Sequence, residues 1–293
     1  MPKSRSLTAL ALLALAAVLA ACGGSDDAAD TASSAAAETT AAAADVCAKE
    51  GLSLETPGRL TVGTDKPAYP PYFVDDDPSN GKGFESAVAY AVAEELGFMA
   101  EEVDWVVVPF ESSYAPGDKN FDFDINQISI TEDRAKVVDF STPYYTAPQA
   151  VIVKADGPLA GVTDFAGLKE AEIGVQVGTT SLDAVKNSIA PGVEPKVFNN
   201  SNDVVSAFKN GQVQAIVTDL PTALYLTAAE LENAKVVGQF AAPGGDEWGL
   251  LLQKDSELTS CVDQALANLE ESGKLQDITV EWMSTEAGAP TLK

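Results

Sequence analysis

The chain has 293 residues, with 18 Lys and Arg against 44 Asp and Glu, no His and 3 Cys. Its net charge of −26 argues against a nucleic-acid-binding role, because so acidic a surface repels phosphate backbones. Without His the sequence offers no credible zinc site and no Ser-His-Asp or Cys-His pair, so we expect no metal, no cofactor and no catalytic residues.

The first 21 residues have the three parts of a secretory signal peptide. Lys3 and Arg5 precede an apolar run from Leu7 to Ala21, which is shorter than the roughly 20 residues that span a bilayer. The sequence Leu19-Ala20-Ala21-Cys22-Gly23 resembles the lipobox of bacterial lipoproteins, whose cysteine is acylated and becomes the first residue after cleavage. We therefore expect a lipid anchor at Cys22 on the outer face of the cell membrane. An ordinary signal peptide with an incidental Cys is the alternative.

Residues 22–45 are predicted to be a disordered tether. Gly24 to Ala44 consist of small and polar residues with a single Glu, and these cannot bury enough surface to offset the entropy of ordering. The remaining chain of about 250 residues fits one large domain or two lobes. No later apolar stretch is long enough to cross a bilayer.

Two cysteines remain if Cys22 carries lipid. Cys47 and Cys261 would then lie in an oxidising compartment, where an even number favours a disulfide. Two separate thiols are the alternative.

From Leu60 onwards, short apolar runs alternate with segments of helical period. Strands are predicted over Leu60–Thr64, Val103–Val108, Phe123–Ile130, Ala150–Val153, Glu172–Val177, Lys196–Phe198, Ala215–Thr218, Lys235–Val237 and Gly249–Gln253. Helices are predicted over Gly83–Leu96, Ser181–Ile189, Asn202–Asn210, Leu220–Leu231 and, in two parts, Ser256–Met283. This alternation indicates α/β units with mostly parallel sheets, whose ligands bind beyond the carboxyl ends of the strands.

The segment from Ile128 to Tyr145 carries the strongest functional signal of the folded part. A strand ends there in hydroxyl residues, and Thr131 is a good N-cap for a following short helix. Free N–H groups of this helix and the Arg134 guanidinium would bind a carboxylate, because the guanidinium fork matches two carboxylate oxygens. The alternative is a surface Arg134 paired with Glu132 or Asp133.

With its flanking motifs, this segment resembles the family 3 extracellular solute-binding proteins of polar amino-acid ABC importers. The supporting motifs are Gly63-Thr64-Asp65, Tyr69-Pro70-Pro71-Tyr72, Gly83-Phe84-Glu85, Val177-Gly178-Thr179-Thr180, the run from Gly211 to Asp219, and Gly273-Lys274-Leu275 with Trp282. The resemblance implies an α/β, two-lobed type II periplasmic-binding-protein fold. Residues 46–148 and 244–293 would form a discontinuous lobe 1, and residues 149–243 an inserted lobe 2, joined by two crossover strands.

The resemblance also implies partners. An amino acid would bind in the cleft between the lobes and be delivered to the membrane permease of an ABC importer, by a protein that is a monomer and not an enzyme. Two other functions stay open: an exported dehydratase on the same fold acting on a small carboxylate, and a ligand-sensing component.

The ligand's charged groups are assigned by motif position within this resemblance. Arg134 would bind the α-carboxylate, helped by Ser129 and by Thr179 and Thr180 at the start of a helix of lobe 2. Asp219, at the end of a strand of lobe 2, would bind the α-ammonium. Asp219 precedes a predicted helix, so it is alternatively only an N-cap.

The ligand's side chain is assigned in the same way. Tyr69 and Phe110 would clamp it, with Asp65 near its tip, although both aromatics are alternatively core residues. Gln127 stands where the family usually has a small residue, and it would narrow the pocket or supply a polar handle.

Other departures from the family pattern touch the same part of the pocket. Lys66 is an extra residue in the first turn, and Ser112 to Asp118 replace the usual helix with residues that are poor helix formers. Asp65 and Glu111 would suit a basic or amide ligand, which is a hypothesis. Trp248 either lines the cleft or packs at the crossover.

Overall fold

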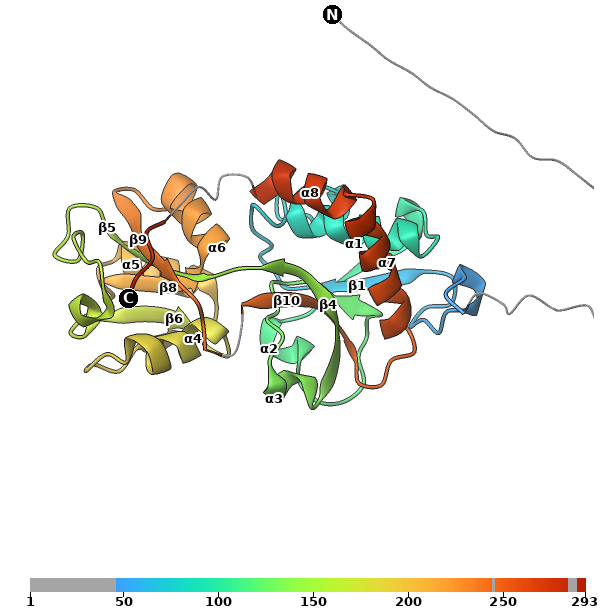
Figure 1. Ribbon diagram of the computed structural model, residues 1–293, viewed down its shortest axis with the longest axis horizontal. Coiled ribbons are helices and arrows are strands. Elements are labelled where there is room, and N and C mark those ends of the chain that lie inside the picture. The colour runs from blue at the N-terminus through green and yellow to red at the C-terminus, as the bar shows by residue number, and fades with distance from the viewer. Residues whose placement is uncertain (1–45, 244–245, 284–288) are drawn as a thin grey trace, which may run out of the picture. The chain divides into compact units, whose positions relative to one another are not determined.

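The computed structural model describes residues 46–243, 246–283 and 289–293 (Figure 1). The predicted signal peptide, Cys22 and the predicted tether up to residue 45 lie outside the described residues. In the part of the chain that is described, no helix is long and apolar enough to cross a membrane.

Strands and helices alternate along the described chain. The strands are β1 (Leu60–Thr64), β2 (Val103–Val107), β3 (Phe123–Asp124), β4 (Val138–Thr146), β5 (Gln149–Lys154), β6 (Ile173–Gln176), β7 (Lys196–Phe198), β8 (Ala215–Asp219), β9 (Ala234–Phe240) and β10 (Glu247–Gln253). The helices are α1 (Phe84–Glu95), α2 (Phe110–Ser113), α3 (Glu132–Ala135), α4 (Thr180–Ala184), α5 (Ser201–Lys209), α6 (Leu220–Tyr225), α7 (Thr259–Glu271) and α8 (Lys274–Met283). Helices α4 and α6 each continue into a π-helical turn, Val185–Ile189 and Leu226–Glu230.

The first sheet has the strand order β2-β1-β3-β10-β4. Helices α1, α7 and α8 pack against one another on one side of it (Figure 1). Apolar residues of β1 and of α1, such as Val62, Phe84 and Val88, are fully buried in the core between them. Helix α1 begins after Gly83, whose φ is +100°. A Cβ atom at this position would lie 2.3 Å from the Tyr72 carbonyl oxygen, so only glycine fits. We call this sheet and its helices lobe 1.

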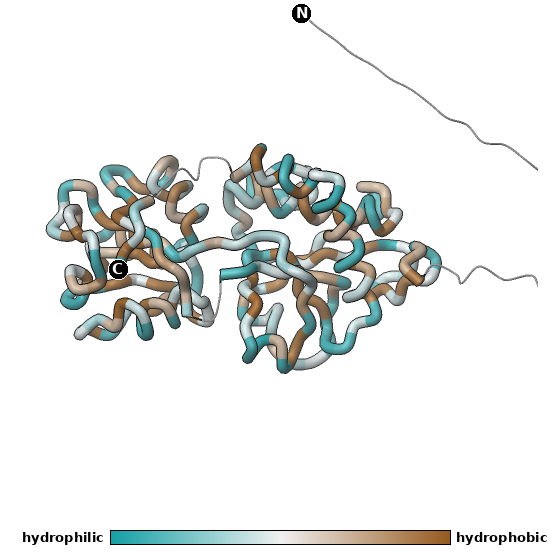
Figure 2. The backbone as a smooth tube through the Cα atoms, in the orientation of Figure 1, coloured by the Kyte–Doolittle hydropathy of each residue, from teal (hydrophilic) through white to brown (hydrophobic). Residues whose placement is uncertain are grey.

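The second sheet has the strand order β7-β6-β8-β5-β9, and we call it and its helices lobe 2. Its strands alternate their side chains between two apolar cores. Val151 and Val153 of β5 pack with α4 residues on one face, while Ala150 and Ile152 pack with α5 and α6 residues on the other. Figure 2 shows apolar segments in strands and in helices of both lobes.

Both sheets are mixed, so the prediction of mostly parallel sheets is wrong. Strand β1 is parallel to β2 and β3, and β6 is parallel to β7 and β8, but β10 is antiparallel to β3 and β4, and β5 is antiparallel to β8 and β9. The antiparallel strands are those next to the passages between the sheets. The chain crosses between the sheets from β4 to β5 and returns from β9 to β10 (Figure 1). The first strand after each crossing, β5 and β10, runs antiparallel to both of its neighbours.

The described C-terminal residues contact lobe 2 although α8 packs in lobe 1. The backbone N–H of Gln239 in β9 donates to the Pro290 carbonyl at 2.7 Å, and the Leu292 N–H donates back to the Gln239 carbonyl at 2.9 Å. Leu292 is 3% exposed in the core of lobe 2, where it covers Gly238. The predicted lobe boundaries stay a prediction. They assign all of residues 244–293 to lobe 1 and do not account for the contact of the last residues with lobe 2.

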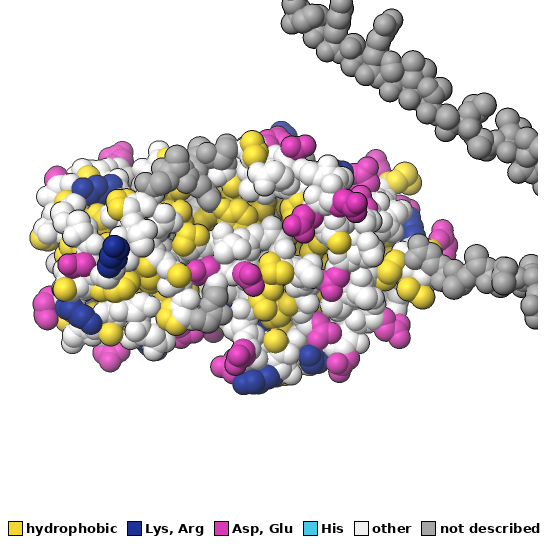
Figure 3. All heavy atoms as spheres, in the orientation of Figure 1, with side chains coloured by type: hydrophobic (Ala, Val, Ile, Leu, Met, Phe, Trp, Pro, Cys, Tyr) yellow, Lys and Arg dark blue, Asp and Glu magenta, His cyan; other side chains and the backbone are white. Residues whose placement is uncertain are grey.

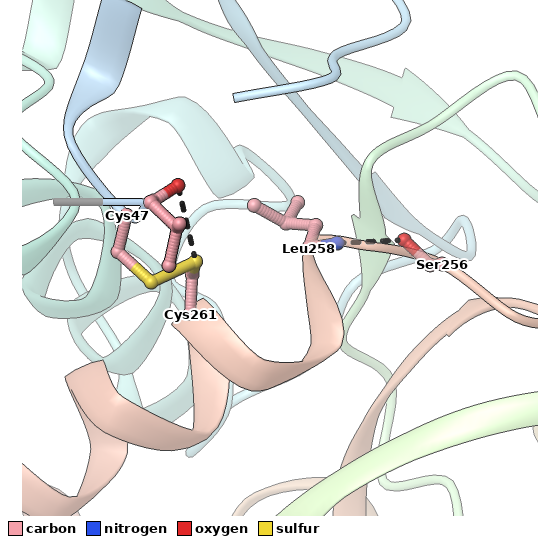
Figure 4. The surroundings of a disulfide bond; sticks show 5 residues. Cys47, Ser256, Leu258 and Cys261 are labelled. Atoms are coloured by element: carbon pink, nitrogen blue, oxygen red, sulfur yellow. Dashed lines mark hydrogen bonds between the residues drawn. A yellow bond between two sulfur atoms is a disulfide. The ribbon is translucent and has the colours of Figure 1, made fainter. Parts of the chain in front are cut away.

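The predicted disulfide joins Cys47 to Cys261, with their Cα atoms 5.3 Å apart (Figure 4). The structure thus confirms the bridge and rejects two separate thiols. Cys261 lies in the first turn of α7 and is 3% exposed, so the bond fixes the segment before β1 to the helical side of lobe 1.

Acidic side chains are spread over the visible surface rather than gathered in one patch (Figure 3). This distribution agrees with the net charge of −26.

Candidate ligand-binding site

A cavity of about 120 Å³ lies between the two lobes. All nine residues predicted to bind a ligand line it: Asp65, Tyr69, Phe110, Gln127, Ser129, Arg134, Thr179, Thr180 and Asp219. The volume is below the roughly 300 Å³ at which pockets for drug-sized ligands begin, so the cavity suits one small metabolite. The roles of these residues toward a ligand stay predictions.

Arg134 is 8% exposed and reaches the cavity from α3. Thr131 caps that helix, since its hydroxyl accepts a hydrogen bond from the Arg134 N–H at 3.2 Å. One guanidinium nitrogen donates to the Ser129 carbonyl at 2.7 Å, and the other donates to the Gly178 carbonyl of lobe 2 at 2.9 Å. Its burial argues against the alternative of a surface arginine paired with Glu132 or Asp133. Asp133 instead pairs with a neighbouring lysine.

The hydroxyl groups beside Arg134 come from both lobes. Ser129 Oγ and Thr180 Oγ1 lie 3.2 Å apart across the cavity. Thr179 is the N-cap of α4, because its hydroxyl accepts from the Leu182 N–H, and it donates to the Gln176 carbonyl. Thr179 therefore fixes the start of α4, whose first N–H groups have no partner within the helix.

Asp219 faces the cavity from the end of β8 in lobe 2. Asp219 occupies the N-cap position of α6, but its side chain makes no capping hydrogen bond to that helix. Instead it accepts from Gln149 Nε2 at 2.5 Å, and Gln149 is held in turn by the Ser181 hydroxyl at 2.6 Å. Burial raises the pKa of Asp219 to about 7, with the Gln149 hydrogen bond and Arg134 opposing the rise. A cation arriving in the cavity would favour its ionised form.

The two predicted clamping aromatics line the cavity and are only partly buried, so neither is a plain core residue. The Tyr69 hydroxyl donates to the side-chain oxygen of Asn202 in lobe 2. Phe110 packs its ring 5.5 Å from the Tyr114 ring and 5.5 Å from the Arg134 guanidinium carbon. Asp65 accepts from the Phe110 N–H at 3.2 Å, which places its carboxylate beside the same ring.

Gln127 adopts a left-handed backbone conformation, with φ of +48°. This turn ends β3 at Asp124, so the strand is shorter than the prediction to Ile130, and Ser129 pairs with Trp248 in an isolated bridge. The Gln127 side chain is anchored rather than free, because its N–H and its amide nitrogen both donate to the buried Glu85 carboxylate. Burial raises the pKa of Glu85 to about 7, opposed by the hydrogen bonds from Tyr144 and Gln127.

Tyr114 is a residue of this site that the sequence analysis missed. Its ring lies 4.5 Å from the Arg134 guanidinium carbon, and its hydroxyl donates to the Gly178 carbonyl at 3.1 Å. The available signal was an aromatic residue four positions after Phe110, a spacing that puts two side chains on one face of a helical turn. The irregular composition of this segment concealed it.

Two open questions about neighbouring residues are answered. Trp248 is fully buried, its ring centroid 5.6 Å from that of Tyr72 and 5.0 Å from that of Tyr145, so it packs at the crossover and does not line the cavity. Glu111 does not line the cavity either. Of the two carboxylates predicted near the end of the ligand's side chain, only Asp65 lines the cavity. Among residues 46–243, 246–283 and 289–293, no group of three or more His, Cys, Asp or Glu is arranged to hold a metal ion.

Comparisons with known proteins agree with this geometry. A family model described as bacterial extracellular solute-binding proteins, family 3, matches residues 60–285. The L-cystine-binding protein TcyJ of Escherichia coli (strain K12) is 29% identical over 248 residues, which cover 82% of this chain and 88% of that protein.

Two solved structures share the fold. An ancestral arginine-binding protein bound to glutamine has a TM-score of 0.66 and 32% identity, covering 78% of this chain and 98% of its own. An ancestral amino acid-binding protein, described as a precursor of cyclohexadienyl dehydratase, has a TM-score of 0.64 and 31% identity, covering 77% of this chain and 95% of its own. The predicted two-lobed periplasmic-binding-protein fold is confirmed.

Proposed function

Because the chain belongs to the bacterial extracellular solute-binding proteins of family 3, we propose that it captures an amino acid between its lobes for an ABC importer. It would deliver this ligand to the membrane permease of that importer as a monomer. Similar proteins that bind cystine, or glutamine in an arginine-binding scaffold, support an amino acid as the ligand.

The observation that carries this proposal is the placement of opposite charges on different lobes. Arg134 of lobe 1 and Asp219 of lobe 2 line one small cavity. A zwitterion that leaves water needs both of its charges paired, because an unpaired buried charge is very costly. Arg134 with Ser129 and the start of α4 would bind the α-carboxylate, and Asp219 would bind the α-ammonium. Both are satisfied only when the lobes are together, so the ligand would favour the closed arrangement.

Calorimetric titration of the purified chain against the twenty amino acids tests this function. We expect one or a few to bind tightly, and Arg134→Ala to abolish binding while the thermal unfolding transition persists. Arg59→Ala is the matched control, because Arg59 pairs with Asp104 at 2.5 Å on the surface of lobe 1 and should leave affinity unchanged. Retained affinity in Arg134→Ala would remove the carboxylate assignment.

The N-terminus would hold this binding module at the membrane. We propose cleavage before Cys22, a lipid on its sulfur, and residues 22–45 as a tether that leaves the folded part free to reach the permease. Labelling cells with a radioactive fatty acid should mark the wild-type chain and not the Cys22→Ala variant. Equal labelling of both would refute the anchor.

The dehydratase alternative is favoured by one comparison, the ancestral precursor of cyclohexadienyl dehydratase. We propose binding without turnover, because Asp219, the cavity carboxyl with a raised pKa, is engaged by Gln149. Incubation with prephenate, followed by its ultraviolet absorbance, should show no product above the rate without protein. Turnover that Asp219→Asn removes would favour the enzyme instead.

A further inference from the structure

Tyr114 lies in the segment between β2 and β3, just after the single turn of α2. The turn is fixed from within, since Ser113 is fully buried and its hydroxyl donates to the Phe110 carbonyl at 2.7 Å. Tyr114 follows this turn and is partly buried. A rigid backbone thus presents its ring at a defined place beside the cavity.

The guanidinium carbon of Arg134 lies over the Tyr114 ring. The ring centroid is 4.5 Å from the Arg134 guanidinium carbon, while the Phe110 ring meets Tyr114 edge-on at an interplanar angle of 79°. An arginine held over an aromatic face is attracted by the negative charge of that face. A cation–π contact uses none of the guanidinium N–H groups as hydrogen-bond donors to an acceptor atom, so they stay available for hydrogen bonds.

The Tyr114 hydroxyl and Arg134 converge on one oxygen of the other lobe. Tyr114 donates to the Gly178 carbonyl at 3.1 Å, and Arg134 donates to the same oxygen at 2.9 Å. A carbonyl oxygen has two lone pairs, so these two donors use both. Gly178 has φ of +70°, and a Cβ there would lie 2.3 Å from the Tyr114 hydroxyl oxygen, so only glycine permits this approach.

These contacts leave Arg134 prepared for a ligand. A guanidinium has five N–H donors, and two of them are used by the Ser129 and Gly178 carbonyls. The other three are left for a ligand, and Arg134 lines the cavity. Preorganisation of this kind raises affinity, because the ligand does not have to immobilise the side chain itself.

We propose that Tyr114 is a positioning residue that fixes the Arg134 guanidinium through this cation–π contact and ties lobe 1 to lobe 2 through the Gly178 carbonyl. Because this link involves protein atoms alone, it would favour the closed arrangement of the lobes whether or not a ligand is bound. The effect on affinity rests on the proposed function, whereas the link between the lobes does not.

Three variants separate the parts of this proposal. Tyr114→Phe removes only the hydroxyl, and Tyr114→Leu also removes the ring. Tyr90→Phe is the matched control, because the Tyr90 hydroxyl donates to the Ser79 carbonyl at 2.9 Å within lobe 1 alone.

The distance between the lobes is measured first, without ligand. Spin labels on cysteines introduced at the exposed Glu132 and Asn187 report on lobes 1 and 2, in the full chain with Cys22→Ser so that no other free thiol is labelled. We expect Tyr114→Phe to broaden the distribution toward longer distances, and Tyr90→Phe to match the wild type. An unchanged distribution in Tyr114→Phe overturns the link between the lobes.

Affinity is measured second, for the best amino acid and for its primary amide, which lacks the carboxylate. Loss of one hydrogen bond should weaken Kd about 3- to 10-fold in Tyr114→Phe. In Tyr114→Leu we expect about 10- to 100-fold, since the cation–π contact is lost as well, and a smaller preference for the acid over the amide. An equal loss for acid and amide, or Kd values within twofold of the wild type, overturns the positioning role.

Failure of the two proposals is distinguishable. A wild-type protein that binds none of the amino acids refutes the proposed function, while the ligand-free distances still decide whether Tyr114 links the lobes. If thermal unfolding shows that Tyr114→Leu is not folded, Tyr114→Phe, which keeps the ring, decides the proposal.

Discussion

Lowering the pH from 8 to 6 should weaken ligand binding about tenfold, through the carboxyl group of Asp219. Burial raises the pKa of this group to about 7 in the ligand-free protein, and the charges of Asp246 and Glu85 add to the rise while Gln149 and Arg134 oppose it. In the proposed complex, the α-ammonium pairs with the ionised form. Below pH 7 the ligand would therefore have to displace a proton before it could pair.

The magnitude follows from the fraction of protein that is protonated. With a pKa of about 7, the apparent Kd rises by a factor of about 11 at pH 6 and about 1.1 at pH 8. About half a proton should be released per ligand bound at pH 7. Calorimetry in two buffers of different ionisation enthalpy measures this release directly, using a ligand whose side chain does not titrate between pH 6 and 8.

Two variants identify the group responsible. Asp219→Asn should bind weakly and show no pH dependence over this range. Glu85→Gln should keep a pH dependence, shifted to lower pH because the charge of Glu85 adds to the raised pKa of Asp219. Glu85 accepts from Gln127 and Tyr144 and does not line the cavity, although burial also raises its own pKa to about 7. Equal Kd values at pH 6 and 8 in the wild type would refute the pairing of Asp219 with the ammonium.

Other predictions concern stability. Cys47→Ser should lower the free energy of unfolding by about 3–5 kcal/mol in a urea titration, because the disulfide closes a sequence separation of 214 residues; a change below about 1 kcal/mol would contradict it. Asp124 is fully buried, and both its carboxylate oxygens lack a hydrogen-bond partner among the described residues, so Asp124→Val should stabilise the protein by about 1–3 kcal/mol at pH 7. Burial raises the pKa of Asp124 well above its usual value, so its cost to stability grows as the pH rises above about 4, and the gain from Asp124→Val should be smaller at pH 5. Asp122→Asn is the control and should destabilise, because that carboxylate accepts from the backbone N–H groups of Thr61 and Glu55; a destabilised Asp124→Val would contradict the reasoning.

The local elements could be predicted because their signals are local. Strand β1 has the predicted bounds, and α1 begins and ends within one residue of its prediction, since Gly83 and the apolar stripe from Phe84 mark it in sequence. Motif order also sufficed to bring the nine predicted site residues to one cavity. Helix caps, turns and periodicity act over a few residues, which a sequence displays directly.

Long-range features escaped prediction for a physical reason. The pairing of β10 with β3 and β4 depends on where a distant segment returns, and no periodicity within β10 records its direction. The contact of Tyr114 with Gly178 joins residues 64 positions apart on different lobes. The end of β3 was misplaced because Gln127 adopts a positive φ that glycine or asparagine would have signalled.

The contact of the C-terminal residues with β9 gives the two lobes a third covalent connection. Besides the two passages through the sheets, a further covalent line runs from Met283 in lobe 1 to Ala289, whose carbonyl binds the Gln239 side chain of lobe 2. Six residue steps at full extension reach only about 21 Å, so the separation of these two points has a ceiling for as long as the tail stays attached. While this contact holds, the length of chain between Met283 and Ala289 therefore limits how far the two lobes can separate, although neither residue lines the cavity.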